Sequence, residues 1–410
     1  RRIQAWLGAE AENAAAENPP TFTRDSVAYQ SDGTQVVANV PRFEQGKFGK
    51  AIMVEEGTTN KFLYSEEFDR SNWTKSGVII TANSETAPSG AMTADKMVED
   101  TSTGTHIINQ GVTISSTSAP VAVSVYVKPA GRTKLRLYVI STNSVGVNFD
   151  LSTMTATNSS GNVIYKSIKS VGNGWYRLEF AGTTSFGSTN VWAVIALRDD
   201  SGNFSYTGDG VSGVYIWGMQ FEEKQYPTTY MATTSSTATR SPETMTIPTT
   251  GVLNPQEGTV ELWFIPQSPY DYNQGMQHRR IFFAGTLTDS NYIQISMFSS
   301  SEFIRFYVGD GAGNRQTISF TFSELGGMDF YGKPHFIAAV WSKSENRIYL
   351  RVDDQTKIST YPSQVPSLTD TIYIGNRENT EQANGLIDDL RISNRARTDE
   401  EILAAYQSGQ

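Results

Sequence analysis

The sequence predicts an all-β protein made of two antiparallel β-sandwich domains, with short helices at both ends. Short runs of alternating apolar and polar residues recur along the chain between Gly, Asn and Asp turns. Long amphipathic helical stretches are missing. The 410 residues provide material for two or three domains with real cores, and no cysteine is present to staple a smaller fold.

Composition also excludes several classes of function. The net charge is −9 and there is no basic run, which argues against a nucleic-acid partner. No apolar stretch is long enough to span a bilayer, so membrane insertion is not expected. Without cysteine, thiolate chemistry and Cys-ligated metals are impossible.

Residues 1–20 predict the only helical opening of the chain. An Ala/Glu-rich run follows three apolar residues that can share one face: Ile3, Trp6 and Leu7. A lone helix this short is marginal in water. Two interpretations stay open, a frayed terminus or a docking and oligomerisation segment in which an exposed Trp6 contacts a partner.

The closing stretch GLIDDLRISNRARTDEEIL predicts a strand followed by a capped helix. Leu390 and Ile392 share their parity with Asp388, so the strand has one apolar face. Glu401 lies three residues after Thr398, which is the spacing of a capping box. The apolar residues expected on one side of this helix are Ile402, Leu403 and Tyr406.

A final strand plus a capped terminal helix resembles the end of laminin-G-like, concanavalin-A-like jelly rolls. The segment GKFGKAIMV (46–54) resembles their opening strand, and HFIAAVW followed by RIYLRVDD resembles their paired central strands. The expected continuation of 46–54 comes only at 244–266. We therefore expect residues 21–59 and 240–410 to form one jelly roll, with residues 60–239 inserted in a surface loop. The alternative is two domains in simple series.

The insert is expected to be a second β-sandwich. In VAVSVYVKP (121–129) the odd-numbered valines alternate with polar residues, which is typical of a half-buried antiparallel strand. The segments 172–180, 205–223 and 226–240 resemble a jelly-roll domain that recurs in structural proteins of tailed bacteriophages and is similar in outline to carbohydrate-binding modules. The tryptophans within its strands are expected in the core: Trp175, Trp192 and Trp217.

Candidate catalytic residues are few. Glycosidases on a concanavalin-like fold need two carboxylates flanking one bond, at about 5–5.5 Å in retaining enzymes. Glu179 and Glu261 are each single on their strands. The three histidines lie in no hydrolase motif and are expected to be ordinary surface or strand-end residues: His106, His278 and His335. The sequence therefore predicts a protein that is not an enzyme.

Asp388 is the candidate metal ligand. Its parity with Leu390 predicts that the carboxylate points into the sandwich, where it must be paired, hydrogen-bonded or metal-bound. Many laminin-G-like domains bind a structural Ca²⁺, so the resemblance makes a calcium site one interpretation. The other is an Asp that accepts hydrogen bonds from loop N–H groups.

Two polar aromatic loops are candidate sugar-binding sites. Tyrosines can stack on a sugar, amides and carboxylates can hydrogen-bond it, and an Arg/His pair could meet an acidic glycan. The residues concerned are Tyr270, Asp271, Tyr272, His278 and Arg279 in one loop, and Tyr206 and Asp209 in the insert. Ordinary surface loops are the alternative interpretation.

The resemblances together imply a non-enzymatic virion protein of a tailed phage, a fibre, spike or decoration subunit. Such a subunit would attach to other virion proteins through residues 1–20, assemble as a homo-oligomer in the host cytoplasm and bind host surface glycans outside. The alternative is a secreted bacterial polysaccharide-binding protein, or the accessory modules of a glycosidase.

Overall fold

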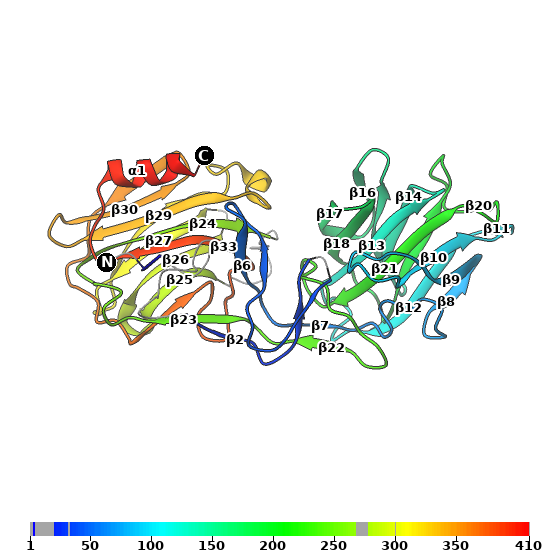
Figure 1. Cartoon of the computed structure of the whole chain (residues 1–410), viewed down its shortest axis with the longest axis horizontal. Coiled ribbons are helices and arrows are strands. Elements are labelled where there is room, and N and C mark those ends of the chain that lie inside the picture. Colours follow the sequence, from blue (N-terminus) through cyan, green and yellow to red (C-terminus); the bar gives the residue numbers. More distant parts are fainter. Residues whose placement is uncertain (1–2, 5–19, 32, 268–277, 300, 410) are drawn as a thin grey trace. The chain divides into compact units, whose positions relative to one another are not determined.

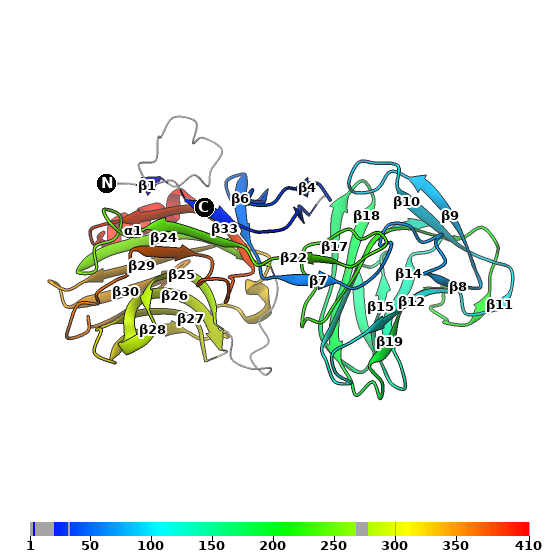
Figure 2. The same ribbon diagram turned by 90° about the horizontal axis from the view of Figure 1, so that it is seen from below.

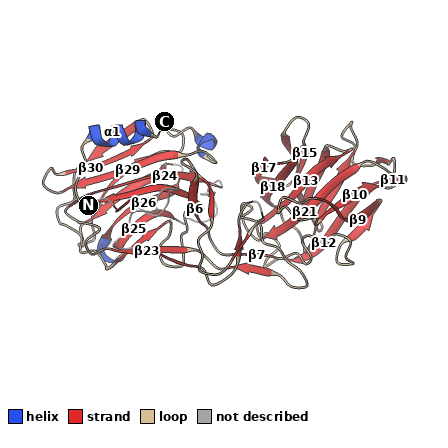
Figure 3. Ribbon diagram, in the orientation of Figure 1, coloured by secondary structure: helices blue, strands red, loops and turns tan. Residues whose placement is uncertain are grey.

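The computed structural model describes residues 3–4, 20–31, 33–267, 278–299 and 301–409. It is an all-β structure, as predicted, and the strands dominate Figure 3. Among the described residues there is one α-helix, near the C-terminus, whereas the sequence predicts helices at both ends. The chain forms two compact units. Unit 1 comprises residues 1–27, 36–57 and 241–410, and unit 2 comprises residues 28–35 and 58–240.

Unit 1 is a sandwich of two antiparallel sheets, each described here in spatial order. The first sheet, A, contains β31 (Gln355–Ser359), β30 (Arg347–Val352), β29 (His335–Ser342), β24 (Glu257–Pro266), β33 (Gly385–Ser393), β6 (Lys50–Val54) and β5 (Phe43–Gln45). The second sheet, B, contains β2 (Thr21–Thr23), β23 (Thr244–Pro248), β32 (Thr371–Ile374), β25 (Arg279–Thr286), β26 (Asn291–Ser299), β27 (Glu302–Gly309) and β28 (Arg315–Phe320). Short 3₁₀ turns span Thr288–Ser290 and Gly327–Phe330.

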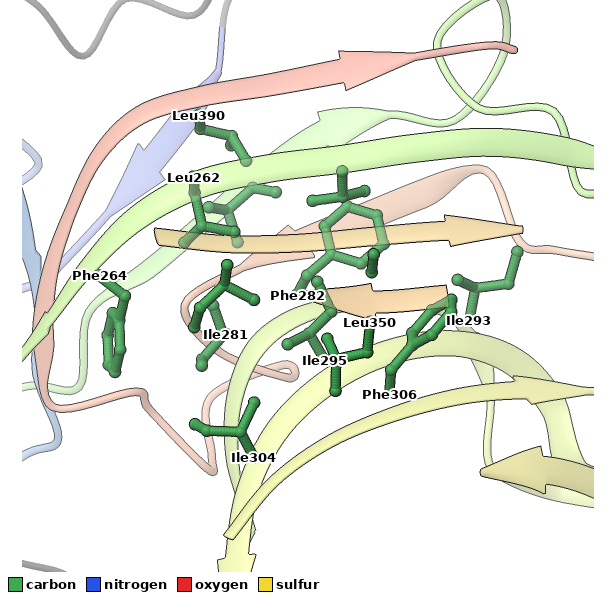
Figure 4. Packing of buried hydrophobic residues seen from close by; sticks show 14 of the residues in the cluster. Leu262, Phe264, Ile281, Phe282, Ile293, Ile295, Ile304, Phe306, Leu350 and Leu390 are labelled. Atoms are coloured by element: carbon green, nitrogen blue, oxygen red, sulfur yellow. The ribbon is translucent and has the colours of Figure 1, made fainter. Parts of the chain in front are cut away.

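The core of unit 1 is filled from alternate positions of these strands. Ile293 and Ile295 of β26 and Ile304 and Phe306 of β27 are fully buried between the sheets, where Figure 4 shows them packed together. Each side chain of this size contributes about 1.5–3 kcal/mol by leaving water. The alternating sequence pattern therefore does set which face of each strand points inward.

The two ends of unit 1 meet at β33. Strand β6 pairs with one edge of β33 and β24 with the other, although β6 lies near the start of the chain. A short strand β1 (Ile3–Gln4) also pairs with β33, beside Ile392 and Arg391. Residues 3–4 are thus strand and not the predicted helix. The part of β33 that β6 leaves unpaired, at Arg391 and Ile392, satisfies their backbone groups. Trp6 lies outside the described residues.

A buried ion cluster joins the separate pieces of unit 1. Arg24 Nη1 donates to Glu243 Oε1 at 2.9 Å, and Arg42 Nη2 donates to Glu243 Oε2 at 2.6 Å. Arg42 also pairs with Glu55 at 3.0 Å. The side chains of Arg24, Arg42 and Glu243 are all 0% exposed. Burial alone lowers the pKa of Arg42, but the carboxylates of Glu243 and Glu55 more than offset this and raise it.

The C-terminal helix α1 (Asp399–Ser408) begins with the predicted capping box. The Thr398 hydroxyl accepts from the Glu401 N–H, and the Glu401 carboxylate accepts from the Thr398 N–H at 3.0 Å. Ile402 is buried against Trp263 and Phe336 on the outside of sheet A. Leu403, predicted on the same side, is instead 39% exposed. The described residues contain no helix with the length and hydrophobicity that a membrane crossing requires.

Unit 2 is a second sandwich of two antiparallel sheets. Sheet F contains β17 (Asn162–Gly172), β18 (Trp175–Thr183), β13 (Val121–Ala130), β21 (Gly213–Glu222), β10 (Ala94–Glu99) and β9 (Val78–Glu85). Sheet E contains β16 (Thr155–Ser160), β15 (Ser144–Asp150), β14 (Lys134–Ile140), β19 (Asn190–Arg198), β12 (Ile107–Thr113) and β8 (Thr74–Ser76). Smaller pairs are β11 (Thr103–Gly104) with β20 (Tyr206–Thr207), β3 (Ala28–Tyr29) with β4 (Gln35–Val36), and β7 (Thr58–Asn60) with β22 (Ala238–Arg240).

The tryptophans of unit 2 do not all lie in its core. Trp175 and Trp217 are 2% and 1% exposed and pack with Tyr126 and Tyr230 on the outer face of sheet F. Trp192 is 47% exposed, so its predicted core position is wrong. Its strand neighbours Val191 and Ala193 point into the core, and alternation therefore turns Trp192 outward.

Residues 58–240, the larger segment of unit 2, begin and end in one strand pair, which Figures 1 and 2 show as β7 and β22. Asn60 lies opposite Ala238 in this antiparallel ladder. A two-residue turn is the commonest connection between such partners.

Replacing residues 61–237 with Asn-Gly should therefore close the ladder and leave unit 1 able to fold. Calorimetry should show one cooperative transition for this shortened chain, and residues 58–240 expressed separately should show their own. A shortened chain without a cooperative transition would mean that unit 1 does not fold independently of the residues removed.

Glu243→Gln should destabilise unit 1 strongly. The change leaves two buried arginines facing a neutral amide, and breaking a buried ion pair in this way costs about 3–5 kcal/mol. Denaturant unfolding should show this loss in the unit 1 transition and no change in unit 2. Glu345→Gln, at an exposed position of the same unit, is the matched control. Equal stability of both variants would contradict the stated role of the cluster.

Candidate functional site

The outer face of sheet B, opposite the core, gathers arginines and aromatic residues from neighbouring strands. Positions that alternate with the core residues of β25 to β28 carry Arg280, Phe283, Tyr292, Gln294, Ser296, Arg305, Tyr307 and Arg315. We call this set the arginine–tyrosine face. Backbone register places Phe283, Gln294 and Tyr307 in one row across three strands. Strands β25, β26 and β28 contain no carboxylate.

Aromatic rings hold the arginines of this face in place. The Arg305 guanidinium lies 4.3 Å from the ring centroid of Tyr307 and 4.2 Å from that of Phe298. Arg315 lies 5.0 Å from the Tyr307 ring and donates to the Tyr292 hydroxyl at 3.1 Å. Such stacking fixes the direction of a guanidinium. Arg305 is 4% exposed, whereas Arg315 is exposed and can reach a ligand.

Tyr292 owes its position to two glycines. It pairs with Gly285 on one side, and Gly309 passes close to the backbone before it. A Cβ at residue 309 would lie 1.6 Å from the Ser290 carbonyl oxygen, so only glycine fits there. The strands can then approach closely beneath the Tyr292 ring.

Buried polar atoms on the face lack partners. The Tyr307 hydroxyl and the Ser296 hydroxyl are buried and have no hydrogen bond. Arg280 is satisfied, since its Nε pairs with Glu381 at 2.9 Å and its Nη1 donates to Gln294. A buried hydroxyl without a partner costs about 1–3 kcal/mol.

His278 borders this face but is not a cation at neutral pH. Its ring stacks on Phe298 with centroids 4.2 Å apart, and its buried Nδ1 has no hydrogen bond. Burial, the largest cause, and then the positive charge of Arg280 lower the pKa of His278 to about 3. The charge of Arg305 lowers it further, and the negative charge of Glu381 opposes the shift. The Arg/His pair expected for an acidic glycan is therefore not available, and arginine supplies the charge.

The remaining residues of the predicted loop are placed as follows. Tyr270, Asp271 and Tyr272 lie outside the described residues. Arg279 is 5% exposed and pairs through its backbone with Met297. Its neighbour Arg280 pairs with Ser296 and belongs to the arginine–tyrosine face. The sequence does contain a signal for this face. In 291–298 and 302–310 one set of alternate residues fills the core, and the other set carries the polar and aromatic residues of the arginine–tyrosine face.

Tyr206 and Asp209 of unit 2 serve their own loop. The Tyr206 hydroxyl donates to Glu99 at 2.6 Å, and Arg132 pairs with the same carboxylate at 2.6 Å. Asp209 accepts backbone N–H groups of Val211 and Ser212, and these hydrogen bonds hold its pKa below the ordinary range. Both side chains thus make hydrogen bonds within their own loop.

Asp388 does not point into the sandwich. Asp389 has a positive φ of 45°, and the pairing of β24 with β33 shifts register between Glu261 and Trp263. This bulge adds a residue and reverses the parity, so Ile387 joins Leu390 and Ile392 in the core. Asp388 lies opposite Trp263 on the outer face. The predicted inward direction is wrong because alternation cannot reveal a bulge.

One oxygen of Asp388 is held by backbone N–H groups. Its Oδ2 accepts the Phe48 N–H at 2.9 Å, and Gly46 leaves room for this because a Cβ there would lie 2.6 Å from the same oxygen. Burial raises the pKa of Asp388, and N–H groups of Phe48, Asp389 and Lys47 oppose the rise. The Oδ1 atom of Asp388 is buried and has no hydrogen bond. Calcium needs six to eight oxygen ligands. In the described part of the chain no three His, Asp or Glu residues group as a metal site.

The carboxylates considered for hydrolysis are held by cations. Glu261 pairs with Arg397. Glu179 pairs with Lys169 and Arg177, both at 2.9 Å, and accepts the Tyr165 hydroxyl. The other histidines have structural contacts: His335 pairs with Asp353 at 2.6 Å, and His106 Nδ1 lies 2.6 Å from the Gly77 carbonyl oxygen.

Part of unit 1 is similar to a known protein family. Residues 240–403 match the family model described as the concanavalin A-like lectin/glucanases superfamily. This part of the chain is therefore a concanavalin-A-like jelly roll, as the sequence predicts. No curated protein is significantly similar to the chain.

Solved structures that match part of the chain include toxin binding domains and a sialidase. The botulinum neurotoxin serotype D binding domain is 16% identical with a TM-score of 0.33, covering 40% of this chain and 40% of that chain. The serotype G binding domain is 14% identical with a TM-score of 0.33 and the same coverage. The NanB sialidase from Streptococcus pneumoniae is 21% identical with a TM-score of 0.30, covering 37% of this chain and 24% of the sialidase chain. The chain thus spans well under half of each, and these values carry no conclusion about ligand or activity.

His278 should make unit 1 lose stability as the pH falls. Its pKa is depressed in the folded state, so the unfolded chain binds more protons between the ordinary pKa of about 6.5 and the folded value of about 3. Stability is therefore full above pH 7 and declines below pH 6.5. His278→Phe keeps a ring against Phe298 and should flatten this decline in urea unfolding at pH 7.5, 6 and 5. Parallel pH profiles for the two proteins would refute the assignment.

Proposed function

We propose that the chain is a non-enzymatic virion protein of a tailed phage or prophage that binds host surface glycans through the arginine–tyrosine face. The observation that carries the proposal is an exposed arginine, Arg315, that is held by stacking on the Tyr307 ring and by its hydrogen bond to the Tyr292 hydroxyl. A carboxylate on the glycan would pair with Arg315, which is exposed.

Binding without turnover is supported by the state of the carboxylates. Glu179 and Glu261, the strand carboxylates singled out for hydrolysis, are each paired with arginine. A general acid must be protonated and a nucleophile free, and the two must flank one bond. Glu179 and Glu261 lie in different units and do not form such a pair.

The virion assignment rests on the resemblance of residues 172–240 to phage jelly-roll domains. In this proposal residues 1–20, including Trp6, attach the subunit to other virion proteins, and several copies form a homo-oligomer. Single sugar sites are weak, so useful affinity would come from several linked copies. The protein would be assembled in the host cytoplasm and act on the outside of the particle. A secreted polysaccharide-binding protein or a glycosidase's accessory modules is the second candidate, and neighbouring capsid or tail genes would exclude it.

Arg315→Gln should weaken binding of the purified protein to host-cell polysaccharide by roughly 10- to 100-fold. The arginine is exposed, so folding should be unaffected, and a hydrogen bond from a charged group contributes about 1.5–3 kcal/mol. Arg347→Gln is the matched control, because Arg347 pairs with Asp399 at 2.5 Å on the other sheet.

Two results would overturn this proposal. Unchanged binding by the Arg315 variant would exclude the arginine–tyrosine face as the glycan site. Shortened polysaccharide chains after incubation with the wild-type protein would exclude the non-enzymatic assignment.

A further inference from the structure

The outer face of sheet E in unit 2 carries an exposed tryptophan beside an apolar cluster. Trp192, near the start of β19, is 47% exposed, whereas Tyr138 on the adjacent strand is buried at 8% exposed. Val194 and Ala196 are buried beside Tyr138, with Ile107, Ile140 and Phe204 packed against them. Single exposed apolar residues are normal, but this tryptophan continues a contiguous apolar surface.

The backbone around Trp192 keeps this surface flat. Trp192 lies between Gly111 of β12 and Ile140 of β14 in the ladder. A Cβ on Gly111 would lie 3.4 Å from the indole Nε1, so the indole ring lies over the glycine. Gly111 contributes no side chain, and one face of the ring is left available for stacking.

Two arginines on the same face have no carboxylate partner. Arg136 lies 4.4 Å from the Tyr138 ring centroid and 5.4 Å from that of Phe204, and it donates only to serine hydroxyls, the nearer at 3.1 Å. Arg198 donates to the Gly202 carbonyl oxygen. Among the described residues neither guanidinium has an ion pair with Asp or Glu. Burial lowers the pKa of Arg136, and the charge of Arg198 lowers it further.

Unpartnered polar atoms surround the same place. Asn148 Oδ1 and Arg198 Nε are buried and have no hydrogen bond. Asn148 lies directly opposite Arg136 in the ladder, and Ala196, two residues before Arg198, lies opposite Arg136 on its other side. The polar atoms without hydrogen bonds therefore lie at the same place as the arginines without a carboxylate partner.

We propose that this face binds a carboxylate-bearing polysaccharide. A sugar ring stacks on Trp192, and a carboxylate pairs with the guanidinium groups of Arg136 and Arg198. Trp192 lies opposite Ile140 of β14, and Arg136 lies four residues earlier on the same strand, about 13 Å away. An occupant that reaches both is therefore an extended chain. The inference rests on the proposed glycan-binding function but places a second site in the other unit.

Charge complementarity selects this occupant. A neutral glycan would leave two guanidinium groups without counter-charge beside an apolar surface, which is costly. A nucleic acid needs a row of cations along its backbone, whereas only two unpaired arginines lie here and the chain carries a net charge of −9. A chain with separated carboxylates and flat sugar faces meets both the tryptophan and the arginines.

The test uses the full-length protein with three acidic polysaccharides: polygalacturonate, hyaluronate and polysialic acid. Methyl-esterified polygalacturonate and dextran serve as neutral counterparts. Wild type should bind at least one acid at least tenfold more tightly than the neutral polymers in calorimetric titration. Trp192→Ala, and separately Arg136→Gln with Arg198→Gln, should each weaken this binding at least tenfold. Ile79→Ala, at a 60% exposed position of sheet F, is the matched control and should bind as wild type.

The outcomes separate this site from the site in unit 1. Loss in the Trp192 variant with unchanged binding by Arg315→Gln supports the inference and removes the arginine–tyrosine face from the proposed function. Loss only in the Arg315 variant, or no binding of any acidic polymer, overturns the inference. Tighter binding of a single-stranded oligonucleotide than of every polysaccharide also overturns it.

Discussion

The buried pairing of Glu243 with Arg24 and Arg42 is the constraint on which the architecture of unit 1 depends. These three charges are fully buried and lie in segments separated by the whole of unit 2. Each isolated charge would cost several kcal/mol, so none can be buried until both segments are in place. The cluster therefore makes residues 21–57 and the strands after residue 241 one cooperative unit. A buried ion pair adds little net stability over apolar packing, and its value here is to specify which segments assemble.

Local pattern predicted those features of the fold that depend on neighbouring residues. The alternation in 291–298 and 302–310 set the core face of β26 and β27, and the Thr398–Glu401 spacing set the start of α1. The prediction for Asp388 is wrong at one residue, because the bulge at Asp389 changes the count on which parity depends. A bulge is stabilised by pairing with a distant strand, and no local signal in DDL reveals it.

The exposed sites could be predicted only in part, for a different reason. Alternation places Trp192 and Trp217 on outer faces, but it does not say what covers those faces. Tyr230 comes from a segment after β21 and packs on Trp217 with centroids 5.0 Å apart, which buries it. No described segment covers Trp192 in this way, and it remains 47% exposed. Coverage is a tertiary property, so the same residue type in the same pattern is core in one sheet and surface in the other.

Both proposed faces place arginine on aromatic rings in a chain of net charge −9. At physiological ionic strength the Debye length is about 8 Å, so an acidic glycan approaching either face is little affected by charges elsewhere on the chain. Attraction then comes from a few arginines at contact distance, whose direction is fixed by stacking. Added salt weakens these contacts but also screens the general repulsion between two acidic partners. Affinity should therefore fall much less steeply with salt than for a protein that binds nucleic acid through many phosphate contacts. A shallow salt dependence with strong dependence on a single tryptophan is thus the expected behaviour of such a face.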